Sequence, residues 1–175
     1  MATLCALRFS SCRGATDALG ETRELARSQK VNVTDAGMLI WEPRERRPTV
    51  HWLVDVSTEP KLNEAFWCML FGLLFYLPLA AGLAGSRGES NRFSLAEFGI
   101  SDEFCTCVRA RVRPGTSVLF LLTTDATVDP VIAALHELEF TIASSNLTNS
   151  QLEALHAAFL PSHDRLRDPR GHGVA

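Results

Sequence analysis

The sequence predicts an α+β domain built on an antiparallel sheet and interrupted by an inserted apolar helical hairpin. Three observations lead to this prediction. Strand-like and helix-like segments alternate along the 175 residues, and 46% hydrophobic with 21% charged side chains is typical of a folded domain. Proline and glycine separate most of these segments. The third observation is a stretch without a charged side chain, from Ala65 to Gly85.

The first part of the chain predicts a β-α-β-β order. Residues 2–9 form a mostly apolar run of strand length, which is typical of a strand covered on both faces. Residues 14–30 place apolar side chains at helical spacing, with an acidic side chain early and basic side chains late, as the helix dipole favours. Residues 31–41 and 49–56 are expected as two strands, and the alternation in the second indicates a sheet edge.

After the apolar stretch, the chain predicts a helix and a central strand. The helix begins at Ser101 or Asp102, either of which can cap it, and ends before the Pro114-Gly115 pair. Residues 116–124 are the most apolar strand candidate in the chain, so we expect this strand in the middle of the sheet.

The last part predicts an α-β-α order. A helix over 126–139 carries Pro130 in its first turn, where the missing N–H costs little. A strand over 140–146 follows, and Thr148 with Gln151 forms a capping box that opens the final helix.

Together these elements predict a ferredoxin-like antiparallel sheet. Two halves of the split βαβ kind, 2–41 and 116–146, would form it, with 49–56 as an added edge strand. We expect a single domain over residues 1–160, with the hairpin insert at about 62–93, and a disordered tail over 161–175.

Charge and cysteine content exclude several classes of function. The formal net charge of −3 gives no overall basic field, so no nucleic-acid partner is expected. The N-terminus has no basic residue ahead of its short apolar run, so no signal peptide is predicted. Five cysteines without a CxxC pair are typical of reduced thiols in the cytoplasm.

The apolar stretch allows three interpretations. Its length of about 21 residues meets the requirement of about 20 for a transmembrane helix, and a buried core helix is the second possibility. A single crossing would place the two halves of the domain on opposite sides of a membrane, each with an unpaired sheet edge. The third interpretation, a helical hairpin that returns to its starting side, avoids this defect.

Pro78 provides the break that a hairpin needs. It divides the stretch into a limb over 65–77, roughly 20 Å of helix, and a shorter Gly- and Ala-rich limb, and neither spans a core of about 30 Å. Small residues would allow close helix packing, and aromatic residues would cover the remaining surface. The candidate membrane or self-association residues are Ala65, Phe66, Trp67, Cys68, Phe71, Gly72, Phe75, Tyr76, Pro78, Ala81, Gly82 and Gly85.

Arg44, Arg46 and Arg47 cluster in the turn before residues 49–56. An eight-residue strand of about 26 Å separates this turn from the start of the apolar stretch, which exceeds a Debye length of about 8 Å. We therefore interpret the arginines as a solvated turn that does not reach lipid headgroups. Better headgroup candidates flank the insert: Lys61, Arg87 and Arg92.

No motif predicts a reaction, a cofactor or a metal site. Cys105 and Cys107 form the one paired thiol motif, but on a helix two residues apart point about 200° away from each other. The five histidines have no spacing typical of paired metal ligands. No catalytic residue and no cofactor is therefore assigned.

Several stretches resemble an uncharacterised bacterial family of predicted membrane proteins, a domain of unknown function. The matching stretches are "MATL", "AFWCMLFGLLFYLPLAAGLAG", "LAEFGISDEF", "RPGTSVLFLL" and "LTNSQLEALHAAF". The resemblance implies a β/α domain interrupted by a small-residue-rich helical hairpin, without an established activity. This chain has fewer glycines in the hairpin, with Cys68, Ala80 and Ala81 among its small positions.

We therefore expect a non-enzymatic bacterial protein that associates with a membrane or with its own copies through the 65–85 hairpin. It would lie at the cytoplasmic face of the membrane, or in the cytoplasm as a soluble oligomer. The alternative is a soluble oligomeric regulatory or small-ligand-binding module with the hairpin buried between subunits. A third hypothesis is a thiol-dependent enzyme that uses Cys105 or Cys107.

Overall fold

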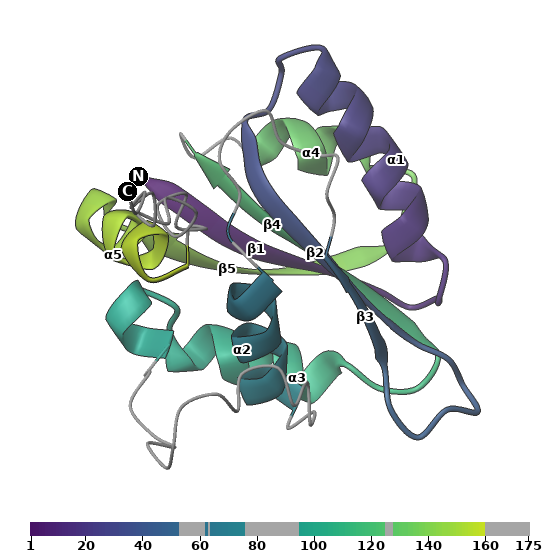
Figure 1. Cartoon of the computed structure of the whole chain (residues 1–175). Helices are drawn as coiled ribbons and strands as arrows, with labels where there is room; N and C mark the ends of the chain where they lie inside the picture. Colours follow the sequence, from purple (N-terminus) through teal and green to yellow (C-terminus); the bar gives the residue numbers. More distant parts are fainter. Residues whose placement is uncertain (53–61, 63, 76–94, 125–127, 160–175) are drawn as a thin grey trace, which may run out of the picture.

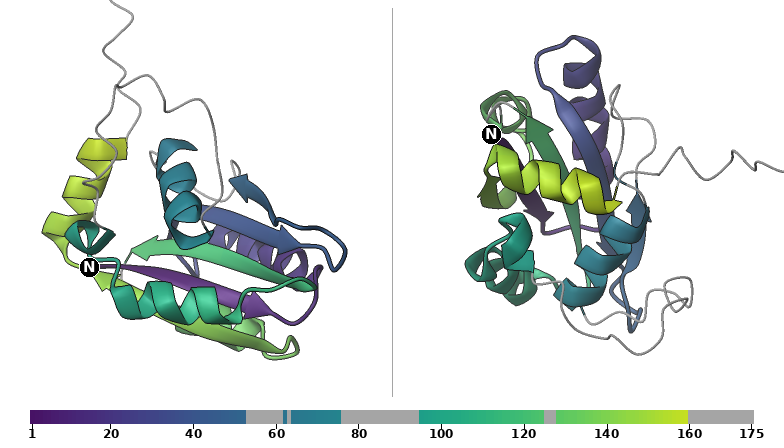
Figure 2. Two further views of the ribbon diagram at one scale, coloured as in Figure 1. Left: turned by 90° about the horizontal axis from the view of Figure 1, so that it is seen from below. Right: turned by 60° about the vertical axis from the view of Figure 1, so that its left-hand side comes forward.

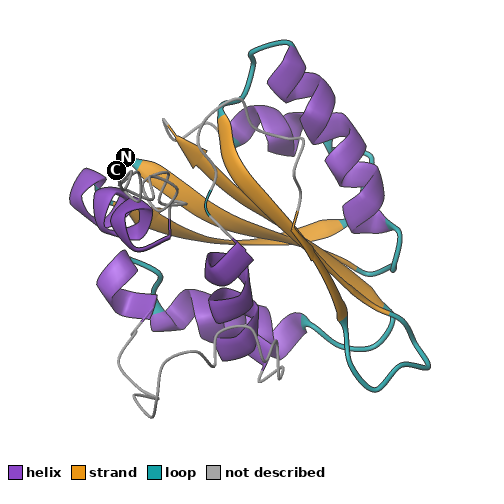
Figure 3. Cartoon of the chain, in the orientation of Figure 1, coloured by secondary structure: helices purple, strands orange, loops and turns teal. Residues whose placement is uncertain are grey.

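The computed structural model describes residues 1–52, 62, 64–75, 95–124 and 128–159. In these residues the chain forms a mixed α/β structure with a five-stranded sheet and helices on both of its faces (Figure 1, Figure 3). The elements in chain order are β1 (Ala2–Phe9), α1 (Gly14–Arg27), β2 (Val33–Trp41), β3 (Thr49–Trp52), α2 (Glu64–Phe75), the 3-10 helix η1 (Leu95–Phe98), α3 (Asp102–Arg111), β4 (Thr116–Thr124), α4 (Asp129–Ala134), β5 (Phe140–Leu147) and α5 (Asn149–Phe159).

The sheet is antiparallel throughout, with the strand order β3-β2-β4-β1-β5. β4 lies between β1 and β2, and β1 lies between β4 and β5. The register pairs Leu4 with Leu122 and Met38 with Leu119. The predicted central position of residues 116–124 and the predicted edge position of the strand that begins at Thr49 are both confirmed.

The side chains of the central strands alternate between two cores. On β1, Leu4 and Ala6 point into the core under α2, α3 and α5, whereas Cys5 and Leu7 point into the core under α1 and α4. Figure 2 (left) looks onto the first of these faces, with α1 behind the sheet. Both faces of β1 and β4 are covered, which is why their sequences are apolar almost without interruption.

Two helices differ in extent from their predictions. The helix expected over 14–30 ends at Arg27. α4 is shorter than the helix expected over 126–139: it ends at Ala134, and the chain turns with a hydrogen bond from the Leu138 N–H to the Leu135 carbonyl at 2.9 Å. Buried Leu135 and the start of β5 at Phe140, whose ring lies 5.8 Å from that of Phe9, hold this turn against the core.

Strands from both sides of the apolar stretch belong to the same sheet. β4, which follows the stretch, pairs along its length with β1 and β2, which precede it. A single membrane crossing between them is incompatible with this pairing.

Some predicted features lie outside the described residues. They are the end of the strand over 49–56, the second limb of the hairpin and its break at Pro78, the flanking Lys61, Arg87 and Arg92, and the tail over 161–175.

Candidate functional site

α2 is the part of the apolar stretch that the structure describes, and one side of it packs on the sheet. The five inward side chains are at most 1% exposed. They are Phe66, Trp67, Leu70, Phe71 and Leu74. For this side of the helix, the structure agrees with the interpretation as a buried core helix.

Trp67 reaches the sheet because β2 has a glycine opposite it. A Cβ atom built on Gly37 would lie 2.6 Å from Cε3 of Trp67, which is closer than real contacts allow. The Trp67 ring stacks on Phe71 at 5.6 Å, and Phe71 meets Phe120 of β4 edge-on at 5.2 Å. Glycine at position 37 therefore lets the helix approach the strand closely.

The outward side of α2 is also apolar, and it carries the small residues of the helix. Ala65, Cys68 and Gly72 are half-buried, and Leu73 is 40% exposed. No charged side chain occurs between residues 65 and 75. We call the surface formed by Ala65, Cys68, Gly72 and Leu73 the outer face of α2.

The predicted membrane or self-association residues thus divide into three groups. Phe66, Trp67 and Phe71 contact the chain's own core, with the Phe66 ring 5.7 Å from that of Phe159 on α5. Ala65, Cys68, Gly72 and Phe75 are half-buried. The others lie outside the described residues: Tyr76, Pro78, Ala81, Gly82 and Gly85. Within the described part of the chain, no helix combines the length and the apolarity needed to cross a membrane.

A buried carboxylate fixes the chain just before α2. Asp35 is 3% exposed and lies at an irregularity in the pairing of β2 with β4. Its Oδ2 accepts a hydrogen bond from the Leu62 N–H at 2.9 Å, and its Oδ1 accepts one from the Ala36 N–H at 2.8 Å. The carboxylate thereby satisfies backbone donors and ties the start of the insert to β2.

An arginine fixes the other end of α2. Arg109 of α3 donates from Nε to the Leu74 carbonyl at 3.0 Å and from Nη2 to the Leu73 carbonyl at 2.6 Å. The last carbonyls of a helix have no partner within it and carry partial negative charge, which a guanidinium complements.

A groove of about 330 Å³ opens beside this contact, between the β2–β3 turn, the end of α2 and α3. Its lining residues are Trp41, Arg46, Arg47, Pro48, Leu74, Phe75, Arg109 and Val112. The distance of about 26 Å expected from the sequence applies to the start of α2. Leu74 and Phe75, at the other end of the helix, line the same groove as Arg46 and Arg47 of the turn between β2 and β3. The β2–β3 turn is seen at the lower right of Figure 1.

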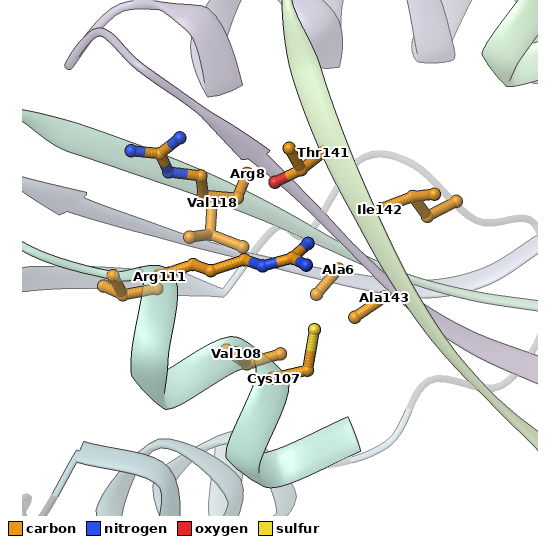
Figure 4. A pocket seen from close by; sticks show the side chains of 10 residues that line it. Ala6, Arg8, Cys107, Val108, Arg111, Val118, Thr141, Ile142 and Ala143 are labelled. Atoms are coloured by element: carbon orange, nitrogen blue, oxygen red, sulfur yellow. The ribbon is translucent and has the colours of Figure 1, made fainter. Parts of the chain in front are cut away.

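The paired thiols lie on opposite sides of α3, as the helix predicts. Cys105 is buried in the core, and burial raises the pKa of its thiol, although the positive charge of Arg109 acts against this shift. Cys107 is half-buried and lines a small separate cavity between α3 and the strands β1 and β5. Figure 4 shows its sulfur pointing into this cavity, along which the Arg111 side chain extends.

This arrangement gives little support to thiol catalysis. A raised pKa keeps the Cys105 thiol protonated at neutral pH, whereas the thiolate is the nucleophile. The cavity beside Cys107 has a volume of only about 10 Å³, room for one water molecule. Among the described residues, no cluster of three or more His, Cys, Asp or Glu side chains could hold a metal ion.

Sequence reasoning missed Asp35, Gly37, Arg109 and the groove. Asp35 and Gly37 do give a signal, because an acid and a glycine inside an apolar strand indicate a buried polar contact and a close backbone approach. Arg109 gives none, since its partners are backbone carbonyls that only the fold brings near.

The family described as "Protein of unknown function (DUF1269)" matches residues 62–160, from the start of the insert to the end of α5. No curated protein and no solved structure matches the chain.

Proposed function

The chain belongs to the DUF1269 family of proteins of unknown function, and we propose that it is a non-enzymatic bacterial protein that attaches to a membrane or to its own copies through residues 65–85. It would do so at the cytoplasmic face of the membrane, or as a cytoplasmic oligomer. The family match begins at residue 62, so it includes the whole of the proposed attachment segment.

The outer face of α2 is the observation that carries this proposal. The solvent-facing side of a surface helix normally carries polar or charged residues. In α2, no charged residue occurs on either side from residue 65 to residue 75. The small residues Ala65, Cys68 and Gly72 occupy the outer face, where they would let another helix come close. Such a face is suited to a second apolar surface, either lipid or a sister chain.

We also propose that the sheet is ferredoxin-like and that the insert is a hairpin. The strand order supports the first point, because one strand separates β1 from β2 and one separates β4 from β5, as in split βαβ units. Pro78, three residues beyond the last described residue of α2, supports the second, because proline interrupts a helix. The return of the chain to the same sheet supports both.

The test compares the mass of the protein in solution with its behaviour on membranes. Deletion of residues 65–85 is unsuitable, because it removes the side chains that fill one core. Leu73→Glu places a charge on the outer face and leaves the inward side chains intact. Ile132→Glu on α4 is the matched control, since Ile132 is 37% exposed on the other face of the sheet.

Two results would support the proposal. A discrete oligomer by light scattering without detergent, dissociated by Leu73→Glu but not by Ile132→Glu, supports self-association. Sedimentation of the protein with membranes supports attachment to lipid if it persists after a carbonate wash and is abolished by detergent. Leu73→Glu should abolish this sedimentation, and Ile132→Glu should not. A wild-type protein that is entirely a soluble monomer would contradict both.

The arginine groove favours a second candidate, a soluble oligomeric module that binds a small ligand. The groove volume of about 330 Å³ falls within the range of small-molecule sites, about 300–1,000 Å³. Saturable binding of a small molecule by the detergent-free protein would support this candidate, and its absence would leave only the first.

A further inference from the structure

Three arginines from two distant segments line the groove beside the end of α2. Arg46 and Arg47 come from the β2–β3 turn and Arg109 comes from α3. Among the residues that the structure describes, no acidic side chain lines the groove. Glu42 and Glu45 belong to the same turn, but neither is a lining residue.

The three arginines differ in whether their side chains form hydrogen bonds within the described part of the chain. Arg109 is engaged with the carbonyls of Leu73 and Leu74. Arg46 and Arg47 are exposed, and neither forms an ion pair or a side-chain hydrogen bond with any other described residue. Two guanidinium groups are therefore available to an anion, while the negative end of α2 is already neutralised by the third.

The walls of the groove are aromatic and aliphatic. Trp41 and Pro48 lie on the side of the turn, and Phe75 lies at the end of α2. The Trp41 Nε1–H is donated to the Glu45 carbonyl at 2.9 Å, so the indole offers its apolar surface and not its donor. A ligand for this groove would combine an anionic group with an apolar part.

We propose that the groove binds a phosphate-bearing amphiphilic anion, with Arg46 and Arg47 on the phosphate and with Trp41 and Phe75 against the apolar part. Guanidinium groups match phosphate oxygens through paired N–H donors, which is why arginine predominates in such sites. This inference deepens the small-ligand candidate above by naming its ligand class. The same chemistry occurs in free organic phosphates and in phospholipid headgroups.

The experiment has one arm for each source. In the first arm, inorganic phosphate and phenyl phosphate are titrated separately into the full chain. Tryptophan fluorescence and calorimetry measure the binding of each. In the second, the chain is sedimented with phosphatidylcholine vesicles, with and without phosphatidylglycerol. The variant is Arg46→Gln/Arg47→Gln, and the matched control is Arg44→Gln, in the same turn but outside the groove lining.

We expect saturable binding in one arm, weakened at least tenfold by the double substitution and less than about twofold by Arg44→Gln. In the first arm, phenyl phosphate should bind more tightly than inorganic phosphate, because the aromatic wall contacts the phenyl ring. Binding in the first arm identifies a free phosphate, and phosphatidylglycerol-dependent binding in the second alone identifies a headgroup.

Two results would overturn the inference. The first is the lack of saturable binding in either arm. The second is a weakening by Arg44→Gln that reaches half of the weakening by the double substitution on a logarithmic scale, as unspecific charge attraction predicts for the loss of one charge instead of two. Light scattering on the same samples measures the oligomeric state, so that the failure of the anion site can be distinguished from the failure of self-association. A monomer that binds phenyl phosphate supports the anion site but refutes self-association, including the oligomeric part of the small-ligand candidate. An oligomer that binds no probe supports self-association and refutes the anion site.

Discussion

The guanidinium group of Arg109 donates a hydrogen bond from Nε to the carbonyl oxygen of Leu74 at 3.0 Å and so joins α3 to the last turn of α2. A second bond, from Nη2 to the Leu73 carbonyl, lies at 2.6 Å. This contact holds the end of the apolar helix against the domain, next to the arginine groove.

Arg109→Met should lower the free energy of unfolding by about 1–2 kcal/mol, because it removes two charge-assisted hydrogen bonds at a partly exposed site. Urea unfolding followed by circular dichroism measures this change. Arg113→Met is the control. Arg113 is exposed, and within the described part of the chain its hydrogen bonds are formed by its backbone, so the substitution should change stability by less than about 0.5 kcal/mol. Equal effects of the two substitutions would show that the Arg109 contact contributes nothing.

Gly37→Ala should destabilise the protein by about 1–3 kcal/mol, because the new methyl group would collide with the Trp67 ring. Combining it with Trp67→Leu should cost less than the sum of the two single changes, since the smaller side chain makes room. Gly20→Ala in α1 is the matched control: a Cβ there meets no atom within 4 Å, and helix propensity predicts a gain of about 0.5–1 kcal/mol. Strict additivity of the Gly37 and Trp67 changes would refute the packing of α2 on β2.

Stability should fall as the pH rises above about 9, because burial raises the pKa of Cys5 from 9.0 to about 12. The unfolded chain then releases a proton that the folded chain keeps, so the contribution is complete below pH 9 and is lost progressively toward pH 12. The slope attributable to Cys5 is at most about 1.4 kcal/mol per pH unit. Urea unfolding of the wild type and of Cys5→Ala at several pH values isolates the contribution of Cys5. If the free energy of unfolding depended on pH identically in the two proteins, the prediction would be contradicted.

Thiol reactivity should separate the cysteines by burial. Cys12, Cys68 and Cys107 are half-buried, whereas Cys5 and Cys105 are buried. With an aromatic disulfide reagent and mass spectrometry, we expect modification of the first three well before the other two, which should react only as the protein unfolds. Rapid modification of Cys105 in the folded protein would revive the thiol-enzyme hypothesis.

Much of the fold could be predicted from local patterns. Continuous apolar runs identified β1 and β4 as central strands, because both of their faces are covered. Capping chemistry identified two helix starts: Ser101 accepts a hydrogen bond from the Phe104 N–H at 3.2 Å, and Thr148 exchanges hydrogen bonds with Gln151.

The candidate site was less predictable, for physical reasons. α2 is apolar on both sides, so periodicity could not tell the side that packs on the sheet from the outer face. The groove depends on the fold placing Leu74 and Phe75 of α2 beside Arg46 and Arg47, a proximity that distance along the chain does not reveal. Whether the outer face contacts lipid or a sister chain stays a prediction.

The most direct test is an environment-sensitive fluorophore on the outer face of α2. It is attached at Leu73→Cys in a chain that also carries Cys12→Ser, Cys68→Ala and Cys107→Ser, with Ile132→Cys in the same background as the control site. We predict blue-shifted emission at position 73 that reverts to a water-like spectrum on dilution or on removal of membranes, with a water-like spectrum at position 132 throughout. Water-like emission at position 73 under all conditions, concentrated and membrane-bound alike, would contradict attachment through this face.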